Sequence, residues 1–169
     1  MAKLGAQIEG IDADVDSIKI AKEHARKENL KIKYTNENLD MLIADNFRKF
    51  DVIFALEVLE HVDYPDDFLS KIASLTEENG LVFVSSINKN IKSLLLAKYL
   101  AEYVLNWVPR GTHDWNKFIN PSDLEKMMFK NSFELISCKG IIFNPMALSW
   151  KIGKDTSINY ITAFKHGSI

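Results

Sequence analysis

The sequence has little of several residue types, and each scarcity excludes a class of protein. It contains one cysteine in 169 residues, which excludes a disulfide framework and a cysteine-based zinc site. Lys and Arg number 21 against 23 Asp and Glu, so the net charge of −2 gives no electrostatic basis for binding nucleic acid. No run reaches the roughly 18 apolar residues of a membrane span, and the N-terminus lacks the apolar core of a signal peptide. We therefore expect a cytoplasmic protein.

The residues that are present have the composition of a globular domain. Hydrophobic residues make up 47% of the chain and charged residues 26%. A chain of this size buries roughly 68–70% of its unfolded surface, which is enough for one core. No internal repeat or linker divides it. We expect a single domain over residues 1–169.

Strand and helix signals alternate along the chain, and this alternation indicates an α/β fold with a mostly parallel sheet. The expected strands cover residues 7–11, 31–35, 50–56, 81–87, 133–140 and 158–165. The expected helices cover residues 14–28, 65–78, 91–108 and 121–130. The run 50–56 is almost continuously apolar, as is typical of a strand covered on both faces. The last two strands are expected to be antiparallel neighbours at an edge.

Asp12 is the first candidate site residue, because it follows a strand and precedes a helix. In nucleotide-binding α/β folds, an acid at this position binds the ribose hydroxyls. The position also suits a helix cap or a turn, which is the more common role for an aspartate there. The glycine-rich turn that usually accompanies a ribose-binding acid is absent upstream.

A second cluster directly follows the apolar strand 50–56, at the sheet edge where α/β folds place ligands. If the segment is helical, Glu57, Glu60 and His61 project from one face. Two carboxylates and an imidazole are suited to a magnesium-like ion, and His61 is alternatively a general base. The other interpretation is a solvated turn.

Two further segments carry unusual side chains. The loop 111–115 holds His113 beside an aspartate and a tryptophan, which suits either a lid over a cleft or a structural turn. The segment 91–108 has a narrow polar stripe and a wide apolar arc. Such an arc is typical of a helix buried between layers, or of one that faces lipid.

The residues around these candidates resemble a known family. Residues 50–53 followed by 56–62 resemble the motif after strand 4 of class I S-adenosylmethionine-dependent methyltransferases. Longer stretches are similar to the ubiquinone-biosynthesis O-methyltransferases, namely Ser86–Ser93, Ala101–Leu105, Val108–Trp115, Lys117–Ile119, Gly140, Phe143–Pro145 and Asn159-Tyr160. The resemblance extends over about residues 1 to 165.

The resemblance implies an activity and a role for each matching residue. The family moves a methyl group from S-adenosylmethionine to a catechol-type hydroxyl on a polyprenylated ring. Asp12 matches its ribose-binding acid, and Leu56 matches its adenosine-contacting position. Glu57, Glu60 and His61 match residues that bind Mg²⁺ in some members. That metal would lower the pKa of the hydroxyl; alternatively, His61 or His113 accepts the proton.

The resemblance also implies where the chain departs from the family. The segment 91–118 matches an insertion that handles the polyprenyl tail or the membrane surface. The resemblance also implies a ubiquinone-biosynthesis complex as a partner. In the family, strand 1 and a glycine-rich loop precede the position of Gly5. Strand 1 lies at the centre of the sheet order 3-2-1-4-5-7-6, so its loss leaves unpaired backbone on both sides. The chain is thus expected to be an incomplete Rossmann-like methyltransferase with an inserted apolar helix after strand 5.

Three interpretations follow for function. The first is a ubiquinone-pathway O-methyltransferase at the inner face of the membrane. The second is a non-catalytic remnant that acts as a lipid-binding or complex-forming module. The third is a subunit that regains strand 1 from a separate N-terminal fragment.

Overall fold

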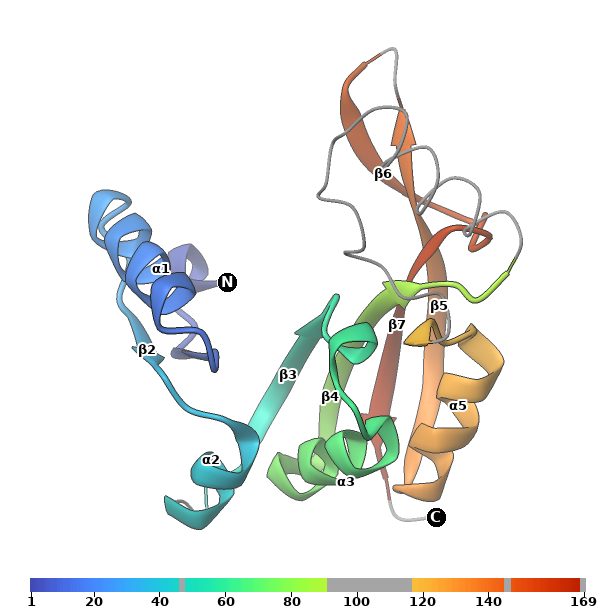
Figure 1. The fold of residues 1–169 in the computed structure, drawn as a ribbon, viewed down its shortest axis with the longest axis horizontal. Helices are drawn as coiled ribbons and strands as arrows, with labels where there is room; N and C mark the ends of the chain where they lie inside the picture. The colour runs from blue at the N-terminus through green and yellow to red at the C-terminus, as the bar shows by residue number, and fades with distance from the viewer. Residues whose placement is uncertain (46–47, 91–116, 145–146, 168–169) are drawn as a thin grey trace. The chain divides into compact units, whose positions relative to one another are not determined.

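The computed structural model describes residues 1–45, 48–90, 117–144 and 147–167. The chain falls into two compact units, Met1–Phe47 and Arg48–Ile169. Figure 1 shows the elements of each unit. The prediction of one domain over the whole chain remains a prediction.

The first unit is a small parallel β-α-β arrangement. Strand β1 (Ile8–Ile11) pairs with β2 (Ile32–Thr35), and helix α1 (Val15–Lys27) connects them. Ile18 and Ala25 of α1 are buried because they lie on its apolar face. A short 3₁₀ turn (Ala2–Leu4) precedes β1, and α2 (Leu39–Asp45) follows β2.

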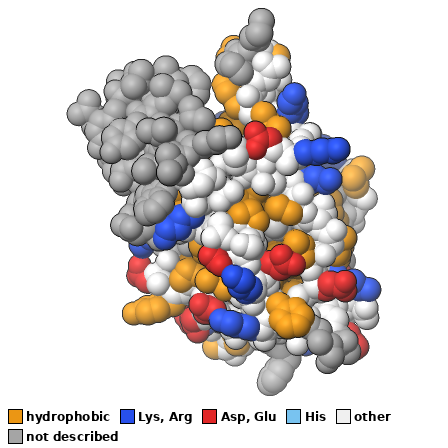
Figure 2. All heavy atoms as spheres, turned by 90° about the vertical axis from the view of Figure 1, so that its right-hand side faces the viewer, with side chains coloured by type: hydrophobic (Ala, Val, Ile, Leu, Met, Phe, Trp, Pro, Cys, Tyr) orange, Lys and Arg blue, Asp and Glu red, His pale blue; other side chains and the backbone are white. Residues whose placement is uncertain are grey.

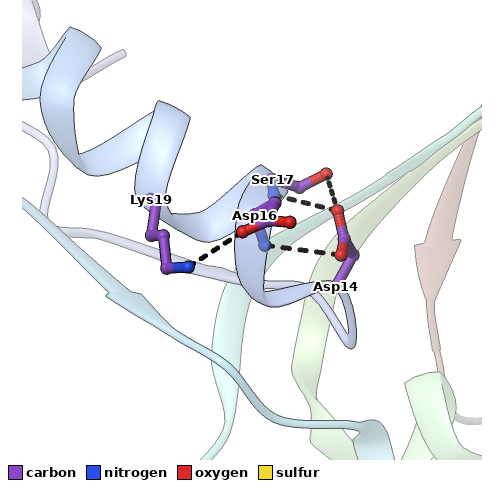
Figure 3. Close-up of polar contacts among 4 residues, drawn as sticks. All are labelled: Asp14, Asp16, Ser17 and Lys19. Carbon is purple, nitrogen blue, oxygen red and sulfur yellow. Dashed lines mark hydrogen bonds and ion pairs between the residues drawn. The ribbon is translucent and has the colours of Figure 1, made fainter.

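Helix α1 begins where its sequence provides a cap. The carboxylate of Asp14 accepts hydrogen bonds from the backbone N–H groups of Asp16 and Ser17, at 3.3 and 2.9 Å (Figure 3). The hydroxyl of Ser17 donates to the same carboxylate at 2.7 Å. These bonds, the Ser17 hydroxyl first, lower the pKa of Asp14. The helix predicted from residue 14 is confirmed.

The second unit is built on a five-stranded mixed sheet. Its strands are β3 (Phe50–Leu56), β4 (Thr76–Ile87), β5 (Phe133–Asn144), β6 (Ser149–Gly153) and β7 (Asn159–His166). Their order in the sheet is β3-β4-β7-β5-β6. Strands β3 and β4 are parallel, and the other pairings are antiparallel. The order β3-β4-β7-β5 agrees with the 4-5-7-6 half of the predicted sheet.

Helices contribute apolar side chains to the core of this unit. They are η2 (Leu59–His61), α3 (Pro65–Leu75) and α5 (Pro121–Lys130); α5 packs on β5, and α3 contacts α5. The largest fully buried side chains are Leu59, Leu69, Ile72, Val82, Val84, Phe118, Leu124, Met128, Phe133, Tyr160 and Phe164. On the face drawn in Figure 2, charged side chains of both signs are interspersed with hydrophobic ones.

Several element boundaries differ from the predicted ones. Helix α3 ends at Leu75 instead of residue 78, because Thr76 adopts extended backbone and its hydroxyl donates to the carbonyl of Ile72 at 2.7 Å. The short elements α2 and β6 were not predicted. Strand β7 lies inside the sheet, with β6 at the edge beyond β5, so the expected edge pair is only partly right.

Strand β3 is less covered than its apolar sequence predicts. Of its seven residues only Ala55 is buried, while Phe54 and Leu56 are 48% and 47% exposed. Among the described strands, β3 pairs with β4 alone. The prediction that both faces of this strand are covered is therefore wrong for the described structure.

The predicted insertion, residues 91–118, lies almost wholly outside the described residues, and so does its apolar helix. Within the described part of the chain, no helix has the length and apolarity needed to cross a membrane. The absence of strand 1 and of the glycine-rich loop also remains an expectation.

Candidate functional site

The carboxyl ends of β3 and β4 carry a network of two glutamates and two serines. Glu57 follows β3 with a left-handed backbone, φ 54°. Its N–H donates to the Ser85 carbonyl at 3.1 Å and to the Ser85 Oγ at 3.0 Å. The Ser85 hydroxyl in turn donates to Glu57 Oε1 at 2.7 Å. One serine therefore holds both the backbone and the carboxylate of Glu57, a geometry that explains the unusual backbone conformation.

The second glutamate of the network is buried. Glu60 lies in η2, is 6% exposed, and accepts a hydrogen bond from the Ser86 hydroxyl at 2.9 Å. A buried carboxylate needs such a donor, because burial without one is costly. Ser85 and Ser86 are adjacent in β4, so each serine serves one glutamate.

The surroundings of Glu57 raise the pKa of its carboxyl group. Burial raises the pKa of Glu57 to about 7, and the Ser85 hydrogen bond opposes that rise. The negative charge of Glu60 and a hydrogen bond between the two carboxyl groups raise the pKa further. Glu57 therefore exchanges a proton near neutral pH, a property that general acid–base groups in active sites require.

The predicted magnesium ligands do not fit a metal ion in this arrangement. Among the described residues, no three His, Cys, Asp or Glu side chains are grouped so that they could hold one. The carboxylates of Glu57 and Glu60 are bonded to serine hydroxyls and to each other, and His61 is exposed. The expectation of a Glu57–Glu60–His61 metal site is therefore not supported.

Asp12 lies in the first unit, directly after β1. Its Oδ1 accepts a hydrogen bond from the Asp14 N–H at 2.8 Å, and the Asn36 amide donates to the Asp12 carbonyl at 2.9 Å. The turn role expected for Asp12 is confirmed, whereas Asp14 and not Asp12 caps the helix. Asp12 is exposed, and its ribose-binding role stays a prediction.

Of the two remaining predicted site residues, Leu56 and His113, the structure describes only Leu56. Leu56 is the last residue of β3, next to Glu57, and is about half exposed. Its contact with adenosine remains a prediction. His113 lies outside the described residues.

Sequence reasoning did not identify Ser85 and Ser86 as part of the site. The available signal was a pair of hydroxyl side chains that interrupts an otherwise apolar strand at its carboxyl end. Their partners are more than 25 residues away in sequence, so only the pairing of β3 with β4 brings them together.

A cavity of about 320 Å³ also went unpredicted, and Val62, the residue after η2, is part of its lining. Its walls come from the segment after η2, from Lys89 beyond β4, and from α5 with the segment before it. The apolar lining is Val62, Pro65, Phe118, Ile119 and Met127, and the charged lining is Asp63, Lys89, Lys117 and Asp123. Lys117 and Asp63 form an ion pair at 3.0 Å.

Comparison with known proteins identifies the class of protein to which this fold belongs. Residues 1–138 match a family described as a methyltransferase domain. A methyltransferase from Methanosarcina mazei has the same fold, with a TM-score of 0.68 and 14% identity over 99% of this chain and 85% of that one. An N-methyltransferase from Bradyrhizobium japonicum, solved with S-adenosyl-L-homocysteine, matches with a TM-score of 0.61 and 11% identity over 96% of this chain and 67% of that one. The chain carries a class I methyltransferase fold.

Two relatives identify the family within the methyltransferases to which the chain belongs. A ubiquinone biosynthesis O-methyltransferase of Pelagibacter ubique is 44% identical over 97% of this chain and 68% of its own length. Another, from Roseobacter denitrificans, is 40% identical over 96% of this chain and 66% of its own length. The chain belongs to the family of ubiquinone biosynthesis O-methyltransferases, and it spans about two thirds of the length of these relatives.

Proposed function

We propose that this chain transfers a methyl group from S-adenosylmethionine to a catechol-type hydroxyl of a polyprenylated ring. The observation that carries the proposal is the Glu57–Ser85–Glu60–Ser86 network, which lies where methyltransferase folds bind ligands. The family membership supports the donor and the substrate class.

In this proposal the chain's own residues move the proton. A phenolic hydroxyl becomes a good nucleophile when it loses its proton, and a base with a pKa near neutrality removes it better than an ordinary carboxylate. Glu57, with a pKa of about 7, meets that requirement. His61, exposed one residue beyond Glu60, is the alternative base, and His113 is a third whose place is not described. No step is assigned to magnesium.

The family resemblance gives each unit one candidate residue for the donor, Asp12 in the first unit and Leu56 in the second. Both residues are exposed. Asp12 directly follows β1, and Leu56 is the last residue of β3. Asp12 would accept from the ribose hydroxyls, and Leu56 would contact the adenine ring. The donor supplies the electrophilic methyl group.

The cavity beside η2 is the proposed place of the aromatic ring. Its volume of about 320 Å³ is at the lower end of small-molecule sites and suits one substituted ring. The polyprenyl tail would leave the cavity toward lipid. We expect the chain to work at a membrane surface, alone or in a biosynthetic complex.

Calorimetric titration of the purified chain with S-adenosylmethionine, followed by a methyl-transfer assay on a short-chain prenylated catechol, tests the proposal. We expect micromolar binding, and loss of most transfer but not of binding in Glu57→Gln. No binding at millimolar donor, or a Glu57→Gln variant as active as wild type, would overturn this assignment.

One observation favours a second function, that of a subunit completed by another polypeptide. Strands β1 and β3 each pair on one side only, with β2 and β4, in the described structure. Open strand edges accept further strands. Here a strand of another polypeptide would pair with one of these edges before the donor binds. Co-expression with a full-length relative's N-terminal segment should then increase donor binding; if the chain alone binds equally well, this alternative is wrong. A remnant that only binds lipid or partners would bind no donor in either test.

A further inference from the structure

Lys89 stands at the carboxyl end of β4, two residues beyond the strand, and it lines the cavity beside η2. The residue is half-buried. In α/β folds this edge of the sheet is where ligands bind, so a lysine here is placed to contact a bound molecule. None of the roles proposed above involves Lys89.

Hydrogen bonds on both sides of Lys89 hold its backbone. The side-chain amide of Asn88 donates to the carbonyl of Thr156 at 2.8 Å. The side-chain amide of Asn90 donates to the carbonyl of Ser157 at 2.6 Å. Both acceptors belong to the connection between β6 and β7, and they restrict the backbone on either side of Lys89. Its side chain therefore extends from a fixed point, which lowers the entropy lost when the ammonium binds a ligand.

A glycine in β5 allows this connection to pack where it does. The backbone carbonyl of Asp155 occupies the place that a Cβ at Gly140 would take, and the backbone nitrogen of Thr156 would lie 3.2 Å from that Cβ. The connection thus packs directly on the backbone of β5, and only a residue without a Cβ leaves room for it. Gly140 therefore supports the two carbonyls that hold Asn88 and Asn90.

The charges around the cavity indicate which kind of group Lys89 binds. The two aspartates of the lining each have another lysine as ion-pair partner, Asp63 with Lys117 at 3.0 Å and Asp123 with Lys126 at 3.2 Å. Lys126 contributes most to the lowered pKa of Asp123, and Lys89 contributes least. These residues together comprise three lysines and two aspartates, so the excess charge at the cavity is positive. A positive cavity favours a ligand oxygen that carries or develops negative charge.

We propose that Lys89 is a catalytic residue whose ammonium binds the catechol oxygen as this oxygen becomes a phenolate. The ammonium donates a hydrogen bond to the oxygen, and its charge stabilises the anion. The hydroxyl proton leaves to the base, the bond between the oxygen and the methyl carbon forms, and the bond between that carbon and the donor sulfur breaks. Asn88, Asn90 and Gly140 are positioning residues. The inference rests on the proposed function in that the cavity holds the ring.

Titration of the full chain with 4-nitrocatechol, in the absence of donor, tests the proposal, because the phenolate of this probe absorbs visible light. We expect the acid ionisation constant of the bound probe to be at least about tenfold larger than that of the free probe. Lys89→Met should remove this increase, and Lys89→Arg should retain most of it. Lys130→Met is the matched control, because Lys130 lies on α5 outside the cavity lining and its side chain is 69% exposed.

Two further measurements separate a catalytic role from a structural one. Asn90→Ala keeps Lys89 but removes the bond to the Ser157 carbonyl, so the increase in the ionisation constant should be smaller than in wild type and larger than in Lys89→Met. In the methyl-transfer assay, Lys89→Met should lower kcat about a hundredfold with an ordinary catechol. The loss should be smaller with a nitro-substituted catechol, because that hydroxyl ionises without help at the assay pH.

Several results would overturn the assignment of Lys89. They are no binding of 4-nitrocatechol to wild type, an equal ionisation constant in wild type and Lys89→Met, an equal effect of Lys130→Met, or a larger effect of Lys117→Met than of Lys89→Met. The titration contains no donor, so its outcome does not depend on methyl transfer. An ionisation constant that depends on Lys89 in a chain without transferase activity would contradict the proposed function alone. Methyl transfer that Lys89→Met leaves unchanged would contradict this inference alone.

Discussion

Replacing Glu57 with glutamine should remove a pH dependence from the stability of the second unit. The folded-state pKa of Glu57, about 7, lies above its ordinary value of 4.5, so the folded protein keeps a proton that the unfolded chain releases in that window. The stability contributed by this proton is complete below pH 4.5 and is lost as the pH rises through 7. The full difference corresponds to about 3 kcal/mol, and solvent contact at Glu57 reduces it to about 1–2 kcal/mol.

Urea denaturation of wild type and Glu57→Gln at pH 5 and pH 8, followed by circular dichroism, measures this effect. The glutamine keeps an oxygen that accepts from the Ser85 hydroxyl, so the two proteins should have similar free energies of unfolding at pH 5. At pH 8 the variant should be more stable by about 1–2 kcal/mol. Glu125→Gln, an exposed substitution on α5, controls for the loss of one negative charge.

The decisive quantity is the change in the free energy of unfolding of each protein between pH 5 and pH 8. If Glu57→Gln and wild type lose the same free energy of unfolding between pH 5 and pH 8, Glu57 does not hold a proton in the folded state as its raised pKa indicates. A similar gain at pH 8 in Glu125→Gln would assign the effect to net charge instead of to the surroundings of Glu57.

Three further substitutions test other parts of the structure. Ser85→Ala removes the hydroxyl that opposes the raised pKa of Glu57, so that pKa should rise above 7 in carbon-detected NMR titration; an unchanged value would contradict the hydrogen bond. Thr76→Val removes the buried hydroxyl that bonds the last turn of α3, and it should cost about 1 kcal/mol of unfolding free energy in urea. Asp12→Asn should weaken S-adenosylmethionine binding about tenfold in calorimetry, whereas Asp16→Asn, which alters only an exposed i,i+3 ion pair of α1, should not.

The local signals in the sequence were sufficient to predict most of the helices and strands. Strand β3 and helix α5 begin and end at the predicted residues, because one is an apolar run and the other starts with an Asn cap and a proline. The elements that were missed are short or exposed. Helix α2 has seven residues, and β6 presents Trp150 and Ile152 outward, so neither has the periodicity of a buried element.

The sequence predicted which segment carries the site, but it did not predict the chemistry of the side chains there. Glu57 and Glu60 were identified because they follow an apolar run that predicts a strand, and such a run is a purely local property. The protonation of Glu57 depends on burial and on a serine from another strand, and one sequence does not contain that information. The same limit explains why a metal site was expected, since three candidate ligands at helical spacing do not reveal hydrogen bonds to Ser85 and Ser86.

The sequence by itself therefore determined the α/β class, the family and the strand ends that carry polar side chains, because those depend on composition, periodicity and motifs along the chain. The tertiary structure alone decided which of these side chains meet. The parallel register of β3 and β4 places Ser85 against Glu57 across 28 residues of sequence. That contact, together with burial, makes an ordinary glutamate a group that exchanges its proton near neutral pH.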